Sequence, residues 1–332
     1  MAFRNFLYDK GIKKTHSFSL PVISVGNLTV GGTGKTPHTE YLIRLLGQSY
    51  RIATLSRGYG RKTEGFIIAD ETATAERIGD EPMQLYRKFA PQTLVTVGEK
   101  RTRAIDRIRA THPEIQAVLL DDAYQHRSVQ PSLSILLTDY HRPFYQDYVL
   151  PAGRLRESRG GARRADLIIV TKCPADLPEE QQTGIIRRIS PYASADTPVF
   201  FTGIRYGNPV AFGNAATPGQ KALLVTGLAD ASPVKAFVQQ QYALAQHLDF
   251  PDHYAYQPKD LENVRICLNQ TGAEAILTTE KDYVKMLSPA LVELAQHLPF
   301  FYIPIEVYFL KKQLVFDDII RLHCQLYPQS IV

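Results

Sequence analysis

The segment Thr29–Thr36, TVGGTGKT, combines residue types that can bind phosphate. Its glycines tolerate backbone angles that turn main-chain N–H groups toward one anion, and Lys35 and Thr36 can contact terminal phosphates and a bound Mg²⁺. The usual pattern of such a loop is G-x-x-x-x-G-K-[ST], and Thr29 stands where its first glycine is expected. A threonine is tolerated there if the backbone keeps a negative φ, so we interpret the segment as a variant phosphate-binding loop.

The residues around this loop predict a strand before it and a helix after it. Leu20–Gly26, LPVISVG, is a short apolar run that is typical of a buried strand. After the loop, Leu42, Leu45 and Leu46 recur at helical spacing, so a helix N-terminus should point at the anion. The predicted nucleotide contacts are Thr29, Val30, Gly31, Gly32, Thr33, Gly34, Lys35 and Thr36.

A second apolar run, Ala117–Asp122, ends in two carboxylates with the sequence AVLLDD. A strand that ends in aspartate is how nucleotide-binding sheets place a carboxylate near Mg²⁺. An aspartate at a strand end can also serve only as a turn or helix cap. Together with the glycine-rich loop, however, the pair Asp121 and Asp122 indicates a magnesium site.

Short apolar strands alternate with helical segments along most of the chain, which predicts an α/β fold with a mostly parallel sheet flanked by helices, of the P-loop NTPase type. We expect a nucleotide-binding core over residues 20–195 and a smaller C-terminal α/β domain over residues 196–332 that completes the cleft. Ligands of such sheets bind beyond the carboxyl ends of the strands, where the loop and the aspartate pair both fall. Residues 1–19 are expected to form a short membrane-proximal segment.

Composition restricts the function less than the motifs do. A net charge of +5 on 332 residues fits anionic partners, although a charge of this size can also carry no functional meaning. The three cysteines are widely spaced and unpaired in pattern, which favours a reducing compartment. The N-terminal segment MAFRNFLYDKGIKK is aromatic and basic; it fits either an interfacial membrane contact or a helix that packs Phe3, Phe6 and Leu7 on the protein.

Several further segments occur together and in order between about residue 20 and about residue 305. They are SRGYGRK, GDEP, DDAYQHR, LPAGRLRE, RADLIIVTK, FPDHYAY and TTEKDYVKM. With the loop, they make the chain resemble the tetraacyldisaccharide 4′-kinases, the lipid A 4′-kinases of Gram-negative bacteria. The resemblance implies transfer of the ATP γ-phosphoryl group to the 4′-hydroxyl of an acylated glucosamine disaccharide 1-phosphate. It also implies Mg²⁺ as cofactor, work at the cytoplasmic face of the bacterial inner membrane, and no nucleic-acid partner.

The resemblance also implies roles for individual residues. Asp80 and His253 match the pair expected to act as general base, which is sound chemistry because an aspartate can orient a histidine that accepts a proton. Asp80 can alternatively be a helix cap, and His253 a loop histidine with a structural hydrogen bond. The implied catalytic residues are Asp80, His253 and Lys35, the implied metal ligands are Thr36, Asp121, Asp122 and Glu157, and the candidates for substrate or phosphate contacts are Arg57, Arg156 and His126.

Some alternatives stay open from the sequence. Gln125, His126 and Arg127 can bind substrate or can support the Asp121–Asp122 turn. The N-terminal segment before the loop strand is shorter than in many members of the family, so its membrane anchor is expected to be short or to have been trimmed. Ala123 replaces a more usual glycine, which a negative φ would allow. A nucleotide-dependent switch protein is the main alternative function, and a nucleic-acid binder that uses the basic loops is a weaker one.

Overall fold

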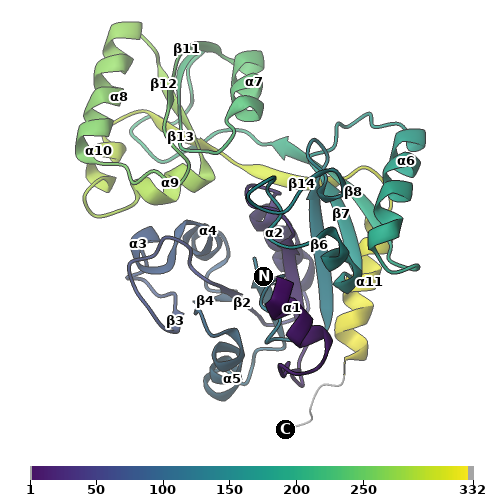
Figure 1. The fold of residues 1–332 in the computed structure, drawn as a ribbon. Coiled ribbons are helices and arrows are strands. Elements are labelled where there is room, and N and C mark those ends of the chain that lie inside the picture. Colours follow the sequence, from purple (N-terminus) through teal and green to yellow (C-terminus); the bar gives the residue numbers. More distant parts are fainter. Residues whose placement is uncertain (1, 328–332) are drawn as a thin grey trace.

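The computed structural model describes residues 2–327, which form two α/β lobes (Figure 1). The large lobe contains a nine-stranded sheet in the order β14-β8-β7-β6-β1-β5-β2-β4-β3, and the small lobe a five-stranded sheet in the order β11-β10-β12-β13-β9. All neighbouring strands of the large sheet run parallel except the edge pairs β14–β8 and β3–β4. The predicted mostly parallel sheet flanked by helices is confirmed.

The strands of the large sheet are β1 (Val22–Asn27), β2 (Ile52–Ser56), β3 (Ile67–Ile68), β4 (Thr93–Val97), β5 (Ala117–Asp121), β6 (Leu133–Asp139), β7 (Leu167–Thr171), β8 (Val199–Tyr206) and β14 (Ile305–Phe309). Its helices are α1 (Ala2–Asp9), α2 (Lys35–Leu46), α3 (Ala75–Ile78), α4 (Asp80–Phe89), α5 (Arg101–Thr111), α6 (Glu179–Ile189) and α11 (Gln313–Leu326), with short 3-10 turns at Phe144–Gln146, Arg159–Arg164 and Ser190–Tyr192. The small lobe contains β9 (Val210–Ala211), β10 (Lys221–Thr226), α7 (Ser232–Gln241), β11 (Ala243–Asp249), α8 (Pro258–Thr271), β12 (Ala275–Thr279), α9 (Glu280–Met286), α10 (Val292–Gln296) and β13 (Phe300–Ile303).

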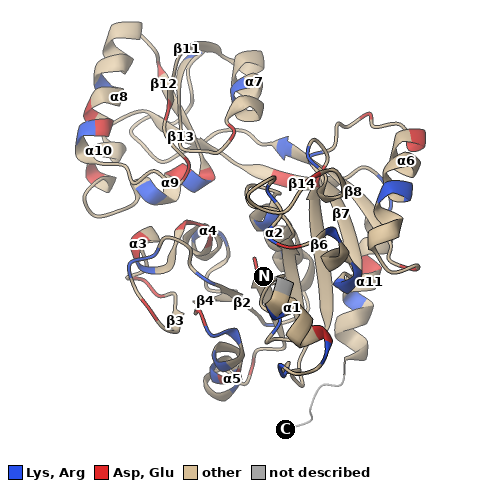
Figure 2. Ribbon diagram, in the orientation of Figure 1, with Lys and Arg blue, Asp and Glu red and all other residues tan. Residues whose placement is uncertain are grey.

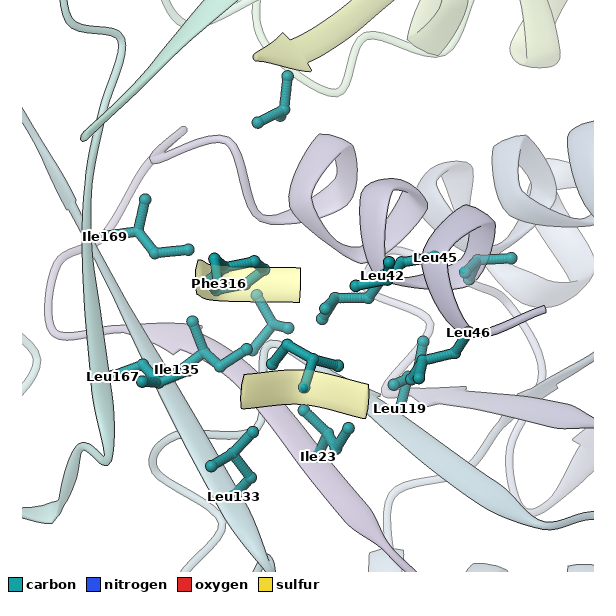
Figure 3. Close-up of a cluster of buried hydrophobic side chains, with 14 of the residues drawn as sticks. Ile23, Leu42, Leu45, Leu46, Leu119, Leu133, Ile135, Leu167, Ile169 and Phe316 are labelled. Carbon is teal, nitrogen blue, oxygen red and sulfur yellow. The ribbon is translucent and has the colours of Figure 1, made fainter. Parts of the chain in front are cut away.

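Alternate residues of the central strands face two separate cores. Ile23 and Val25 of β1 pack in the cluster that also contains α2 and α11, whereas Val22 packs with α5 on the opposite face. In Figure 3, Phe316 of α11 lies beside Ile135 and Ile169 of the sheet. Burial on both faces explains why these strands are almost continuously apolar in sequence.

The division into lobes differs from the predicted boundary at residue 196. β8 pairs with β7 in the large sheet, and β14 returns to pair antiparallel with β8. Helix α11 then buries Phe316 and Ile320 in the core of the large lobe. The small lobe is therefore an insertion between β8 and β14, and the C-terminal residues belong to the first lobe. Sequence periodicity identified these elements but could not show with which sheet each strand pairs.

The N-terminal helix α1 is fastened to the large lobe by polar contacts. Arg4 donates to the main-chain carbonyl of Gln125 at 2.8 Å, and Arg127 forms an ion pair with Asp9 at 2.7 Å. Phe3 and Phe6 are exposed on this helix, so these two side chains do not pack on the protein as one interpretation of the sequence proposed, whereas Leu7 is half-buried. Within residues 2–327, every helix is too short or too polar to cross a bilayer.

Candidate active site

The glycine-rich loop follows β1 and leads directly into α2. Gly31 and Gly34 have φ of 112° and 80°, the left-handed region that favours glycine. Thr29 does not have a positive φ, because the chain continues as extended backbone and forms a bridge with Leu155. The amide of Val30 donates to the carbonyl of Arg154 at 2.8 Å. Thr29 therefore extends the strand and does not need to be glycine. A threonine was expected to be tolerated here if its φ is not positive, and this condition is met.

Polar side chains hold the loop from inside the protein. Asn27 donates to the hydroxyl of Thr33 at 2.8 Å, and Thr171 donates to the Thr33 carbonyl at 3.0 Å. His38 donates from Nδ1 to the Gly34 carbonyl at 2.7 Å, and its Nε2 lies 3.0 Å from the hydroxyl of Thr202. Burial lowers the pKa of His38 to about 4, so the ring is neutral at pH 7. The loop is thus fixed in shape before any ligand binds.

The aspartate pair lies beside the loop because β5 is the immediate neighbour of β1, with Asp121 opposite Val25. Asp121 is buried and accepts a hydrogen bond from Thr39 at 3.2 Å; burial raises its pKa to about 7, against the opposing charge of Lys35. Asp122 lies 3.5 Å from the ammonium of Lys35 and 3.1 Å from Arg156. Burial opposes its ionisation, but Lys35 and Arg156 outweigh this effect and lower its pKa. One carboxylate is therefore held charged next to the loop.

Asp122 also shows how the turn after β5 is built. Its φ is 49°, a conformation that aspartate tolerates better than most residues. Ala123 does not have a positive φ, so the alanine fits where a glycine was more usual. Gln125 donates to the carbonyl of Asn27 at 2.8 Å and so supports the end of β1. This contact gives Gln125 a structural role.

Glu157 is placed differently from the other predicted metal ligands. Its buried carboxylate accepts hydrogen bonds from Asn5 at 2.7 Å, from Gln125 at 3.1 Å and from Arg164 at 2.8 Å. The contacts of Glu157 thus connect α1 to the turn after β5, and none of its hydrogen bonds within residues 2–327 reaches Asp121 or Asp122. Its role as a metal ligand remains a prediction. Its hydrogen bonds show that it holds α1 against the turn after β5.

Asp80 and His253 meet across the two lobes. His253 Nδ1 lies 3.3 Å from the Asp80 carboxylate, although the residues are 173 positions apart. Asp80 is the first residue of α4 and follows the N-cap, Gly79, so the plain capping role considered for it is not what the helix shows. His253 has φ of 58°, and the ring of Tyr59 lies 5.0 Å from its own. The structure therefore brings together the two residues that are predicted to act as general base.

Arginine and histidine side chains gather on the other side of the aspartate turn. Arg101, at the start of α5, is almost fully buried, yet among the described residues its Nε and one terminal nitrogen find no hydrogen-bond partner. Burial lowers the pKa of Arg101 to about 10, and Arg57 acts on it in the same direction. Burial likewise lowers the pKa of His126 to about 4, with Arg101 and Arg57 contributing. Unsatisfied buried donors of this kind indicate an anion site.

A pocket of about 870 Å³ opens between the loop after β2 and the start of α5. Arg57, Tyr59, Arg61, Lys100 and Arg103 are among the residues that line it. Tyr59 lines the pocket and its ring also lies 5.0 Å from that of His253, so this tyrosine stands between the pocket and the Asp80–His253 pair. The sequence analysis missed Arg101 and this pocket. The signal was a basic run, KRTR, which begins three residues after the last residue of β4, at the edge of the sheet where ligands bind.

A fixed glycine-rich loop at a helix N-terminus, with a carboxylate strand as its neighbour in a mostly parallel sheet, is the arrangement of P-loop nucleoside triphosphate-binding proteins. Within residues 2–327 there is no cluster of three or more His, Cys, Asp or Glu side chains suited to a metal ion. A protein of this class does not need one, because Mg²⁺ is usually held by one or two carboxylates together with phosphate oxygens.

Comparison with known proteins makes the class specific. The family model described as tetraacyldisaccharide-1-P 4′-kinase matches residues 1–324, and the chain belongs to this family. A tetraacyldisaccharide 4′-kinase of Flavobacterium johnsoniae is 46% identical over 95% of this chain and 91% of its own length. One of Bacteroides thetaiotaomicron is 43% identical over 93% of this chain and 86% of its own length. The crystal structure of the Aquifex aeolicus LpxK protein in complex with ATP covers 97% of this chain and 94% of that one, with a TM-score of 0.73 at 27% identity.

Proposed function

We propose that this protein transfers the γ-phosphoryl group of ATP to the 4′-hydroxyl of a tetraacylated glucosamine disaccharide 1-phosphate, a step of lipid A biosynthesis. Family membership supports the reaction class. The observation that carries the proposal is the Asp80–His253 pair, contributed by two lobes to one place. Asp80 begins α4, and Gln84 and Lys88 of this helix contact Glu40 of α2, the helix that follows the phosphate loop. A proton acceptor near a phosphate loop is what transfer to a hydroxyl requires.

On the nucleotide side, the amides of Gly31–Gly34 and the ammonium of Lys35 would surround the β- and γ-phosphates. The hydroxyl of Thr36 and the carboxylate of Asp122 are suited to hold Mg²⁺, which would neutralise phosphate charge. Asp122 is already kept ionised by Lys35 and Arg156. Asp121, buried behind it and bonded to Thr39, would orient this turn rather than bear a full charge of its own.

On the acceptor side, the sugar hydroxyl would approach the Asp80–His253 pair from the pocket next to Tyr59. The 1-phosphate gives the acceptor a second anionic group, and Arg101 and Arg57 supply the positive charge that suits it, with the neutral ring of His126 beside them. Arg101 supplies N–H donors that have no other partner in the described part of the chain. Binding a phosphate would satisfy these donors.

The acyl chains of such an acceptor are anchored in a bilayer, so the protein must work at its surface. We propose peripheral association with the cytoplasmic face of the bacterial inner membrane through α1. Phe3 is 74% exposed and Phe6 49% exposed, whereas Arg4 and Asn5 of the same helix contact the protein. An amphipathic helix with its apolar side chains outward suits the membrane interface.

The direct test is incubation with ³²P-labelled ATP, Mg²⁺ and the disaccharide 1-phosphate lipid in mixed micelles, followed by chromatography of the lipid. Labelled lipid is expected with the wild type, and Lys35→Met should abolish labelling because the phosphate charge loses its ammonium partner. Hydrolysis of GTP in preference to ATP, with no labelled lipid, would instead favour a nucleotide-dependent switch.

A further inference from the structure

Helix α9 places a lysine against the predicted base. It begins at Glu280, directly after β12, and the side chain of its second residue, Lys281, faces His253. The ammonium nitrogen of Lys281 lies 3.3 Å from His253 Nε2 and 2.9 Å from the carboxylate of Asp252. Figure 2 shows charged residues of both signs along α9, which lies opposite α4.

The chemistry of the two groups fixes where the proton of the imidazole sits. An ammonium group only donates hydrogen bonds, so Nε2 must accept, and an accepting ring nitrogen carries no proton. The proton of the neutral ring then lies on Nδ1, which faces Asp80 at 3.3 Å. A histidine in this form presents an unprotonated Nε2 on the side away from Asp80.

We propose that Lys281 is a positioning residue for His253: it selects the Nδ1–H tautomer and reserves Nε2 for the proton of the acceptor hydroxyl. The inference rests on the proposed function for its catalytic meaning, but the tautomer itself is a property of the unliganded protein. Family membership does not supply it, since it follows from the contacts of one side chain.

The step can be written in full. As the acceptor hydroxyl binds, it replaces the ammonium at Nε2, and Lys281 keeps its contact with Asp252. The hydroxyl proton moves to Nε2, the oxygen lone pair forms the new bond to the γ-phosphorus, and the bond from that phosphorus to the β–γ bridging oxygen breaks. ADP leaves with that electron pair, and the doubly protonated ring is stabilised by Asp80.

The charges around the ring explain why the lysine is needed. Asp252 lies 3.8 Å from Nε2 on the same side, and burial of this carboxyl is outweighed by Lys281 and His253, which lower its pKa. The carboxylate of Glu81 lies 4.0 Å from the ammonium of Lys281. On the other side of the ring, the ammonium of Lys285 lies 3.8 Å from the carboxylate of Asp80. Without Lys281, His253 would face Asp80 and Asp252 together. Two carboxylates favour the doubly protonated ring, which cannot accept a proton.

The substitutions that test this are Lys281→Met, which removes the charge at similar length, and Lys281→Arg, which keeps it. Lys259→Met is the matched control, because Lys259 is an exposed lysine of α8 in the same lobe. In the lipid kinase assay we expect Lys281→Met to lower kcat by roughly 10- to 100-fold with the KM for ATP changed by less than about threefold. The acid limb of its pH–rate profile should move to higher pH, and Lys281→Arg should recover part of kcat.

A second readout does not depend on catalysis. In ¹⁵N-histidine NMR spectra, with the His253 signals assigned by His253→Ala, the wild type should show a protonated Nδ1 and an unprotonated Nε2 at pH 8. Lys281→Met should lose this preference. A wild-type ring protonated at Nε2, or spectra and pH profiles that Lys281→Met leaves unchanged, would overturn the proposal. If the wild type labels no lipid, the proposed function fails, whereas the spectra still decide the role of Lys281.

Discussion

The roles of single residues at this site follow from their backbone conformation and from whether their hydrogen-bonding groups have partners. Thr29 is accommodated because its backbone is paired as a strand, whereas Gly31 and Gly34 are needed for their positive φ. Arg101 is the opposite case, a buried guanidinium with donors that lack partners in the described structure. A buried polar group that has its hydrogen-bond partners stabilises the fold, whereas a buried donor without partners indicates where a ligand binds.

The predicted base gives the first residue-scale prediction. Asp80→Asn and His253→Ala should each lower kcat by about 10²- to 10⁴-fold, because general-base assistance is lost, while nucleotide affinity stays within about threefold. Steady-state kinetics with lipid acceptor and equilibrium binding of a fluorescent ATP analogue measure the two quantities. Full turnover in both variants would show that neither residue accepts the proton.

Arg101 gives the second prediction. Arg101→Met should raise the KM for the lipid by about 10-fold or more, with the KM for ATP almost unchanged, because an anion loses hydrogen bonds from a buried charged donor. Arg103→Met, a change at a basic residue of the same helix that lines the neighbouring pocket, is the comparison. An acceptor without the 1-phosphate should bind wild type and Arg101→Met alike; a KM difference for that acceptor would contradict the assignment.

His38 gives a prediction about pH. Its pKa is lowered from 6.5 to about 4 in the folded protein by burial, so the unfolded chain binds a proton more readily than the folded one. Stability should therefore be complete above about pH 6.5 and fall as the pH drops toward 4, by up to about 3 kcal/mol from this residue. Urea unfolding at pH 7.5 and pH 5 measures the loss. His38→Gln should show a smaller loss; an equal one would assign acid sensitivity elsewhere.

At the scale of elements, the contact between α4 and α9 connects the nucleotide side to the small lobe. Lys88 of α4 lies 2.7 Å from Glu40 of α2 and 2.5 Å from Glu280 of α9. Glu40 also accepts a hydrogen bond from Gln84 at 2.7 Å. Burial raises the pKa of Glu280, and Glu40 adds to this effect by repulsion. One ammonium group thus joins three helices, of which α2 carries the phosphate loop and α4 carries Asp80.

Lys88→Met would leave Glu40 and Glu280 facing each other with little solvent. We expect a loss of about 2 kcal/mol in unfolding free energy and a lower kcat, because the small lobe would no longer hold His253 against Asp80. In a double-mutant cycle, Glu280→Gln added to Lys88→Met should restore part of both, since it removes the repulsion. Additive losses in urea unfolding and in kcat would mean that the two residues do not share this contact.

At the scale of the whole molecule, the sequence predicted the sheet and the loop well because both depend on local patterns. The apolar run of β1 and the glycines after it specify the phosphate loop without reference to the rest of the chain. The pairing of Asp80 with His253 was available from the resemblance, whereas spacing could not give it, since it joins residues from different lobes. Arg101, Lys281 and Lys88 went unnoticed for the same reason: their significance lies in what folding places around them.

The predicted boundary between the lobes differs from the structure for a related reason. The segments around Val199 and Ile305 read as ordinary apolar strands, and hydrophobic periodicity does not say which sheet a strand joins. The answer depends on long-range pairing, in which Val307 lies opposite Ile204. The existence of these strands was thus easier to predict than the sheet to which each one belongs.

The two connections to the small lobe leave the large sheet from adjacent strands, and Gly207 donates to the carbonyl of Pro304 at 2.8 Å where they separate. This bond fastens the two connections to each other, and the contact of Lys88 with Glu280 holds the small lobe at a second place. Both attachments must keep their geometry for the histidine to lie against its aspartate.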